Sequence, residues 1–156
     1  KKYVFDTCVK LSEDGKENSR VLPAGAVLVT CIASIGKNAI AKIPLATNQQ
    51  INAIVVNKSY SNEFIYYLLT FKKSVLEATA GAGALKMLSK GAFQKIKFLI
   101  PKVEEQEAVA NILATADREI AELESKLILI TDQKNYLLNN LITGTIRTPE
   151  KLSTHN

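Results

Sequence analysis

The chain has 156 residues, 47% of them hydrophobic and 22% charged, and its net charge is +5. This composition indicates a folded protein, and its longest run of aromatic and aliphatic residues, Phe64 to Phe71 with Thr70 as the one interruption, is far too short to cross a bilayer. The only histidine is His155, and Cys8 and Cys31 form no CxxC pair, so a multi-histidine metal site is excluded and the body of the chain lacks the usual general base.

These absences lead to three expectations. We expect no catalytic residue, no bound metal and no cofactor. No secretion signal opens the sequence, and the two cysteines are typical of free thiols in a reducing compartment, so we expect a cytoplasmic protein.

The first hundred residues are predicted to form a small mixed α/β domain. Five segments are rich in β-branched and aromatic residues and read as strands: 3–10, 26–32, 38–43, 50–56 and 97–100. The turn Ser34-Ile35-Gly36-Lys37 separates the second and third of these strands, which predicts a hairpin. We expect polar residues 13–18 to form a loop.

Helical periodicity begins after Ser61. Apolar side chains from Phe64 to Leu76 fall on one helical face, Ser61 is a plausible N-cap, and Glu63 lies in the first turn. Gly81-Ala82-Gly83 is expected to end this helix, and residues 89–95 are predicted to form a short one.

Residues 102–143 are predicted to form one uninterrupted helix, because no glycine or proline lies between Pro101 and Gly144. Its apolar side chains recur at alternating steps of four and three, interrupted only by Lys134, which is typical of a coiled-coil seam. We predict that this seam is a dimerisation surface made of Val109, Leu113, Ala116, Ile120, Leu123, Leu127, Ile130, Leu137 and Leu141. The alternative, that the helix folds back on its own domain, is disfavoured because that domain is too small to cover it.

The predicted fold class is therefore α+β: a small α/β domain over residues 1–101, a coiled-coil helix over 102–143 and a flexible tail over 144–156. Charge follows this division. Residues 1–101 carry 14 basic and 6 acidic side chains, whereas residues 102–142 carry 4 basic and 8 acidic side chains. Such asymmetry favours a polyanionic partner for the first segment only, although lysines spread for solubility would give the same totals.

Two glycine motifs were considered as phosphate-binding loops, and both fail. Gly36-Lys37 has Cys31 where a Walker motif needs its first glycine, and Asn38 where it needs Ser or Thr. The second motif, Gly81-Ala82-Gly83, follows a helix rather than a strand.

The sequence features that indicate nucleic-acid binding are stronger than those of a phosphate-binding loop. Lysine contacts phosphates, and lysines beside glycines allow close approach to a phosphate backbone. The candidate DNA-binding residues are Lys37, Asn38, Lys72, Lys73, Lys86 and Lys90. Solvated loop tips explain the lysines about equally well, and the amide cluster at residues 48–50 is explained better by local backbone hydrogen bonds than by base reading.

The order of several short motifs carries more information than any one of them. Over residues 20–147 the sequence resembles the target recognition domain of type I restriction-modification specificity subunits. The motifs that carry the resemblance are Leu22-Pro23-Ala24-Gly25, Ala33-Ser34-Ile35-Gly36-Lys37, Asn48-Gln49-Gln50, Ile100-Pro101 followed by Glu105-Gln106, and Leu141-Ile142-Thr143-Gly144.

The resemblance implies a non-catalytic subunit whose recognition domain reads one half of a split DNA target. It also implies long helices that pair antiparallel and dock methyltransferase (modification) subunits, to which a restriction subunit is added. No Asn/Asp-Pro-Pro-aromatic methyltransferase motif is present.

A complete subunit of this kind has two recognition domains and two helices, so we expect a half-subunit or a fragment. It would form a homodimer or pair with another specificity subunit through the helix. The alternative is an assembly module that pairs through its helix without reading DNA.

Overall fold

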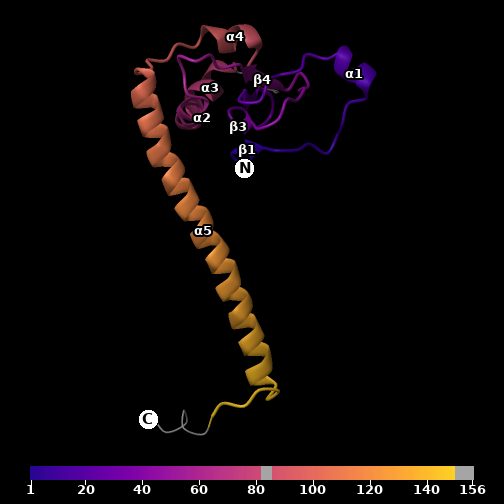
Figure 1. Cartoon of the computed structure of the whole chain (residues 1–156), viewed down its shortest axis with the longest axis vertical. Helices are drawn as coiled ribbons and strands as arrows, with labels where there is room; N and C mark the ends of the chain where they lie inside the picture. Colours follow the sequence, from indigo (N-terminus) through magenta and orange to yellow (C-terminus); the bar gives the residue numbers. More distant parts are fainter. Residues whose placement is uncertain (82–85, 150–156) are drawn as a thin grey trace. The chain divides into compact units, whose positions relative to one another are not determined.

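The computed structural model describes residues 1–81 and 86–149. The chain divides into two compact units, residues 1–111 and residues 112–156 (Figure 1). The long helix α5 (Val103–Ile142) begins in the first unit and makes up most of the second. The predicted fold class, a small mixed α/β domain followed by one long helix, is confirmed. No helix in the described part of the chain has the length and apolar character needed to span a membrane.

The first unit is built on a four-stranded sheet with the order β1-β3-β2-β4. Its strands are β1 (Tyr3–Val4), β2 (Val27–Thr30), β3 (Asn38–Ala41) and β4 (Ile51–Ile54). The predicted hairpin is confirmed, since β2 and β3 pair antiparallel, and β4 pairs antiparallel with the other side of β2. β1 is parallel to β3. The central strand β2 therefore has a partner on each side.

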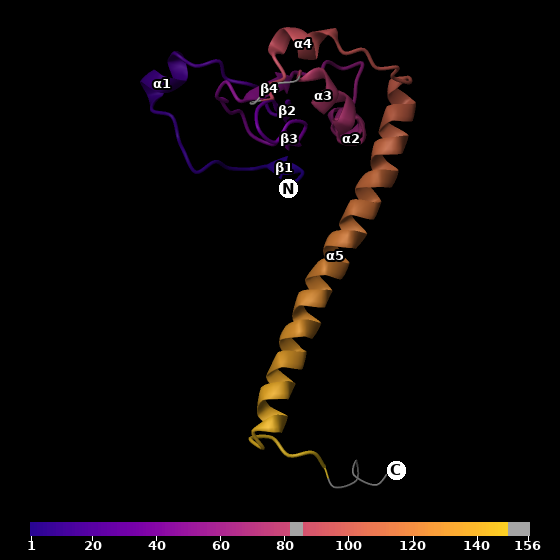
Figure 2. The same ribbon diagram turned by 180° about the vertical axis from the view of Figure 1, so that it is seen from behind.

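Two helices pack beside this sheet, α2 (Asn62–Phe71) and α3 (Lys73–Thr79), and both views place them next to the strands (Figures 1 and 2). As predicted, Ser61 is the N-cap of α2, and its hydroxyl accepts a hydrogen bond from Phe64 N at 3.3 Å. The core lies between α2, α3 and the sheet. Its fully buried side chains include Val27, Val29, Ile40, Leu69 and Leu76.

Three sequence predictions are corrected in the sheet and in the helices beside it. The first strand covers only Tyr3–Val4, because β1 meets β3 only opposite Ile40 and Ala41. The single helix expected after Ser61 is two, because α2 ends at Phe71, Lys72 caps it with a non-helical backbone, and α3 starts at Lys73. Residues 97–100 are not a strand, since no described segment pairs with them.

Residues 13–18 are not a loop, because Glu13–Glu17 form the short helix α1. Ser12 caps this helix by accepting a hydrogen bond from Gly15 N at 3.1 Å, and Glu13 and Asp14 favour its first turn. The short helix α4 (Lys90–Lys95) was predicted, and Ser89 is its N-cap. Of the triplet Gly81-Ala82-Gly83, only Gly81 lies within the described residues, and most of the predicted tail lies outside them.

A compact polar cluster attaches β1 to α2. Lys2 Nζ lies 2.6 Å from Glu63 Oε2 and donates to the Tyr67 hydroxyl at 2.7 Å, and the Tyr3 hydroxyl donates to Glu63 Oε1 at 2.9 Å. Burial alone would lower the pKa of Lys2, but the hydrogen bonds to Glu63 and Tyr67 raise it above its ordinary value. Lys2 is therefore charged at neutral pH and holds the two-residue edge strand in place.

The start of α5 is fixed by Gln106, a polar side chain that is only 1% exposed. Its Oε1 accepts from the backbone N–H of Ser61 at 2.9 Å, and its Nε2 donates to the carbonyl oxygens of Pro101 at 2.8 Å and Ser59 at 3.5 Å. One amide thus joins the first turn of the long helix to the segment that leads into α2.

Replacing Gln106 by Leu should lower the free energy of unfolding by about 2–3 kcal/mol, because it leaves the Ser61 N–H and the Pro101 carbonyl buried without partners. The measurement is urea unfolding followed by tyrosine fluorescence, since four of the five tyrosines lie in the first unit. Glu107→Gln, at the exposed neighbouring position, is the matched control and should change stability by less than about 0.5 kcal/mol. Equal stability of the two variants would contradict this role of Gln106.

Candidate nucleic-acid interface

Lys37 lies at the end of a hydrogen-bonded turn that connects β2 to β3. Ile35, in the middle of the turn, is 3% exposed and belongs to the core. The Thr30 hydroxyl donates to the Ser34 carbonyl, the Lys37 N–H donates to the Thr30 hydroxyl at 3.1 Å, and Thr30 N donates to the Lys37 carbonyl at 2.8 Å. The backbone of the turn is therefore closed by hydrogen bonds, while the Lys37 side chain is exposed.

Gly36 brings this turn against α3. It has a φ of +79°, and a Cβ at this position would lie 2.9 Å from Cγ of Lys73. Because only glycine fits both the backbone conformation and the space, the turn lies directly on the first residue of α3. Lys37 and Lys73 are thereby gathered on the same part of the surface, and the ion pair of Lys73 with Glu77 at 3.6 Å is half-exposed and therefore weak.

Lys86 and Lys90 are held at the same end of β2. The Leu88 N–H donates to the Cys31 carbonyl at 2.8 Å, and Met87 forms an antiparallel bridge with Ile32, just before the turn that carries Lys37. Both lysines are exposed. Four of the six candidate DNA-binding residues thus surround the C-terminal end of one central strand.

The other two candidates have different surroundings. Lys72 ends α2, is half-buried, and its Nζ lies 4.8 Å from the ring centroid of Phe71. The amide of Asn38 donates to the Tyr66 carbonyl at 3.0 Å and accepts from the Thr70 hydroxyl at 3.1 Å, which joins β3 to α2. Asn38 thus has a structural role that the sequence did not reveal, and a DNA contact by its side chain stays a prediction.

The amide cluster at residues 48–50 also forms local bonds. Asn48 Oδ1 accepts from the Gln50 N–H at 3.0 Å, which is the local backbone interaction anticipated as the alternative to base reading. In the following strand, Asn52 Nδ2 donates to the Leu88 carbonyl at 3.2 Å.

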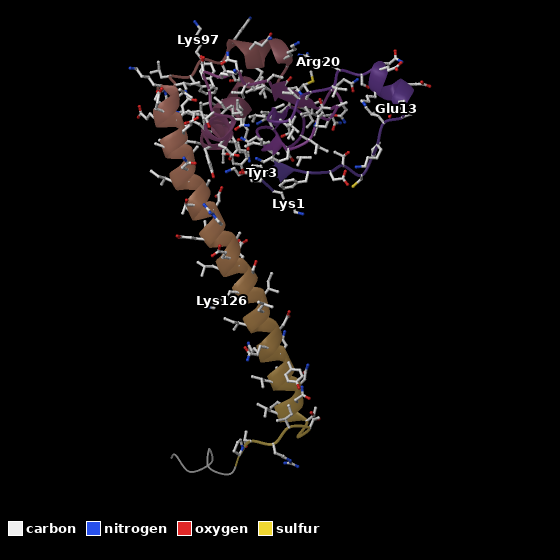
Figure 3. The ribbon with its side chains drawn as sticks, in the orientation of Figure 1. Lys1, Tyr3, Glu13, Arg20, Lys97 and Lys126 are labelled. Atoms are coloured by element: carbon white, nitrogen blue, oxygen red, sulfur yellow. The ribbon has the colours of Figure 1, made fainter. Side chains whose placement is uncertain are left out.

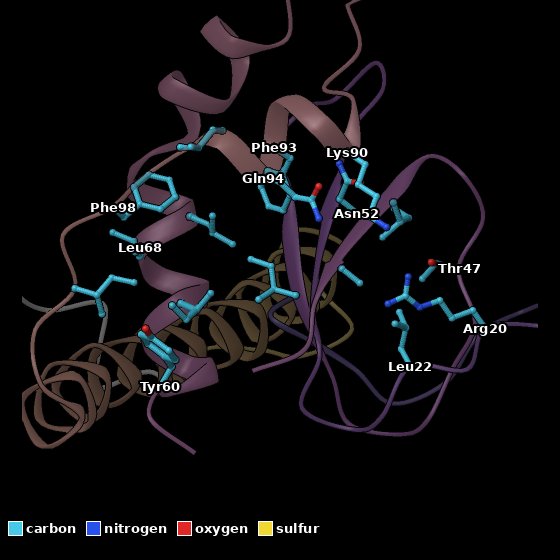
Figure 4. Close-up of a pocket in the computed structure, with 17 residues that line it drawn as sticks. Arg20, Leu22, Thr47, Asn52, Tyr60, Leu68, Lys90, Phe93, Gln94 and Phe98 are labelled. Atoms are coloured by element: carbon cyan, nitrogen blue, oxygen red, sulfur yellow. The ribbon is translucent and has the colours of Figure 1, made fainter. Parts of the chain in front are cut away.

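A cavity of about 600 Å³ lies beside Lys90, which forms part of its lining (Figure 4). Apolar side chains of β4, α2 and α4 form much of its wall, and Arg20, Lys90 and Gln94 are among its polar lining. Sequence reasoning did not assign Arg20 to a site, although the signal was present, since Arg20 is the only arginine among the first 101 residues.

The described residues offer few reactive groups. Within 1–81 and 86–149, no three His, Cys, Asp or Glu side chains are placed so that they could hold a metal ion. Burial raises the pKa of the Cys31 thiol, which is therefore neutral at pH 7, and its Sγ donates to the Gln49 carbonyl at 3.5 Å.

The predicted seam of α5 carries exposed apolar side chains. Val109 is half-buried, whereas Leu113, Ala116, Ile120, Leu123, Leu127, Ile130, Leu137 and Leu141 are all exposed. The exposed fraction reaches 66% at Leu123 and 65% at Leu127. Charged side chains such as Lys126 are interspersed along the helix (Figure 3). An apolar seam of this length is stable in water only when another surface covers it.

Residues 7–131 match the family model described as the type I restriction modification DNA specificity domain. The chain is 33% identical over 100 residues to the specificity subunit of the type I restriction enzyme MjaIX from Methanocaldococcus jannaschii, a match that covers 63% of this chain and 23% of that subunit. It is 29% identical over 154 residues to the HindI specificity subunit of Haemophilus influenzae, a match that covers 92% of this chain and 32% of that subunit. The chain thus spans about a quarter to a third of the length of these relatives.

Solved structures share the fold. The HsdS subunit from Thermoanaerobacter tengcongensis aligns with a TM-score of 0.56 at 20% identity, covering 67% of this chain and 25% of that chain. The S subunit of a type I restriction-modification system from M. genitalium aligns with a TM-score of 0.61 at 17% identity, covering 78% of this chain and 33% of that chain. The family resemblance of the ordered motifs is confirmed by the family model over residues 7–131.

Gly36→Ala should destabilise the first unit by about 1–3 kcal/mol, because alanine is strained at this positive φ and its Cβ would meet Lys73. Gly91→Ala is the matched control. Gly91 lies in α4 with no atom near the position of a Cβ, so the change should be neutral or stabilising by up to about 1 kcal/mol. Thermal unfolding of both variants measures the difference, and a neutral Gly36→Ala would show that the turn does not pack on α3.

Proposed function

We propose, since the chain belongs to the family of type I restriction-modification DNA specificity domains, that its first unit binds double-stranded DNA and reads one half of a bipartite target. The observation that carries the proposal is the match to the family model over residues 7–131, which includes strands β2 to β4, helices α1 to α4 and most of α5. Methylation and cleavage are assigned to partner subunits, and the chain itself to recognition.

The charge distribution supports the DNA role of the first unit. Lys37, Lys86 and Lys90 lie on two segments that backbone hydrogen bonds tie to the C-terminal end of β2, and Lys73 lies on α3 against the turn that carries Lys37. Lysines on rigid loops contact phosphates at fixed positions, and this sets the register of a protein on a duplex.

The seam of α5 supports a helical partner. The helix has 40 residues, which gives a length of about 60 Å, and its exposed heptad positions run from Leu113 to Leu141. We propose that a second long helix covers this seam, from a second copy or another specificity subunit. Ile128, Leu129 and Tyr136 lie on the opposite side of the helix and are also exposed, and there we place the contact with a modification subunit.

The recognition function is tested by methylation mapping in cells that express the chain together with the modification subunit of its system. The proposal predicts methylation at a motif of two short specific parts separated by a spacer. Unchanged methylation, with stable pairing of the chain to another specificity subunit, would favour the alternative function as an assembly module that does not read DNA.

Lys37→Ala combined with Lys73→Ala should weaken binding to duplex DNA and reduce the slope of log K against log salt by about 2, because each phosphate contact contributes about 0.9. Fluorescence anisotropy of a labelled duplex, titrated at salt concentrations from about 50 to 200 mM, gives both the affinity and the slope. Lys58→Ala removes an exposed lysine from the segment before α2, so the slope should change by less than 1. Equal slopes for the two variants would exclude a phosphate contact by Lys37 and Lys73.

Leu123→Asp combined with Leu127→Asp should abolish association through α5, because it puts two charges in the centre of the seam. Multi-angle light scattering of the whole chain should change from a dimer to a monomer. Ser125→Asp places a charge on another side of the same helical turn and should leave the dimer intact. A wild-type chain that is monomeric in solution would place the partner of the seam outside this chain.

A further inference from the structure

One edge of the sheet is open. Cys31 N donates to the Gln50 carbonyl at 2.8 Å, and the antiparallel register then makes Val29–Asn52 and Val27–Ile54 the next hydrogen-bonded pairs. Ala53, opposite Leu28, therefore turns its N–H and C=O away from β2. Among residues 1–81 and 86–149 no partner is found for either group.

On the other side of the sheet, the outer edge of β3 is paired. There β1 is added in parallel, and the backbone N–H groups of Ile40 and Lys42 donate to the carbonyls of Lys2 and Val4 at 2.8 and 2.9 Å. The sheet is thus extended by a short strand on the β3 side, while β4 lacks a further strand on its outer side.

The cavity of about 600 Å³ runs along this open edge, since all four residues of β4 line it. It reaches both faces of the strand. Leu68 of α2 and Phe98 lie on one side, and Leu22 and Thr47 lie on the other (Figure 4). An occupant that paired with β4 would therefore bury alternate side chains on the two faces, as a strand does.

The segment from Ile96 to Ile100 also borders the groove. Ile96, Phe98 and Ile100 line the cavity and are half-buried, whereas Lys97 is exposed and Leu99 is fully exposed. This is the period of two that predicted a strand here, and the segment makes no backbone hydrogen bond of a ladder within the described residues. A segment with the side-chain pattern of a strand thus lies beside the open edge of β4.

The rim of the groove is basic. Arg20 and Lys90 both line it and both are exposed. In the described part of the chain no ion pair joins either of them to an acidic side chain. The rim therefore favours an occupant that carries acidic groups.

We propose that this groove is a docking site for an extended peptide strand of another polypeptide, which pairs with Ala53 of β4, places apolar side chains on both faces of the edge and presents an acidic residue to Arg20 or Lys90. This is recognition by β-strand addition, in which backbone hydrogen bonds give affinity and alternate side chains give specificity. A second copy of the chain fits less well, because symmetric pairing of two β4 edges would oppose two basic rims. The proposal is argued from the open edge of β4 and does not rest on the DNA role, although Lys90 belongs to both surfaces.

The test uses a fluorescein-labelled synthetic peptide of alternating valine and threonine with glutamate at both ends, titrated with the full chain in an anisotropy assay. Saturable binding is expected. A peptide N-methylated at alternate backbone nitrogens, which cannot donate to β4, should bind at least tenfold more weakly. Ala53→Pro should lose at least tenfold, since proline at an edge position removes only the outward N–H, and Lys58→Ala should bind normally.

A second variant keeps the test decisive if Ala53→Pro does not fold. Arg20→Glu changes only an exposed side chain, and it should weaken binding of the glutamate-ended peptide and strengthen binding of the same peptide with lysine ends. The proposal is overturned if neither peptide binds or if N-methylation has no effect. It is also overturned if Ala53→Pro reduces self-association of the chain while peptide binding is absent, because the occupant would then be a second copy.

Discussion

The buried amide of Gln106 is the constraint on which the start of the long helix depends. A polar side chain that is 1% exposed is tolerated only when its hydrogen-bonding groups are satisfied, and here the backbone groups of Ser59, Ser61 and Pro101 satisfy them. The same backbone N–H of Ser61 belongs to the residue that caps α2. The start of α2, the end of the extended segment before Pro101 and the first turn of α5 are consequently fixed by one side chain.

This arrangement has a consequence for recognition. α2 packs on β2 and β3, and Asn38 and the Lys2 cluster tie it to the sheet. The turn that carries Lys37 closes the β2–β3 hairpin and rests on α3. The backbone that carries the lysines of this unit is held by buried residues such as Ile35 rather than by the cations themselves.

The parts of the fold that were predictable are those whose signal is local in sequence. The Ser61 cap, the hairpin turn, the short helix after Ser89 and the long helix without glycine or proline each depend on residues a few positions apart, and the structure has all of them. α1 was missed although its signal was local too, because the Ser12 cap precedes a polar segment with no apolar face to mark it as helical.

The features that escaped prediction depend on distant contacts. Gln106 and Ser61 are 45 positions apart, and Asn38 and Tyr66 are 28 apart, so no spacing in the sequence could connect them. At the candidate site, the sequence could predict which lysines are candidates for DNA binding. It could not predict that they lie together, because Gly36 contacts Lys73 only after the hairpin and α3 have packed.

Residues 97–100 show what a local pattern can and cannot determine. Alternating burial prepares a segment to lie in a sheet, but a strand exists only when a neighbour supplies hydrogen bonds, and the described residues supply none to it. The same reasoning applies to the open side of β4 and to the exposed heptad of α5. All three surfaces have the side-chain pattern of an element with a neighbour, and that neighbour is missing from the described residues. These three patterns are the basis on which we propose a strand as the neighbour of β4 and a helix as the neighbour of α5.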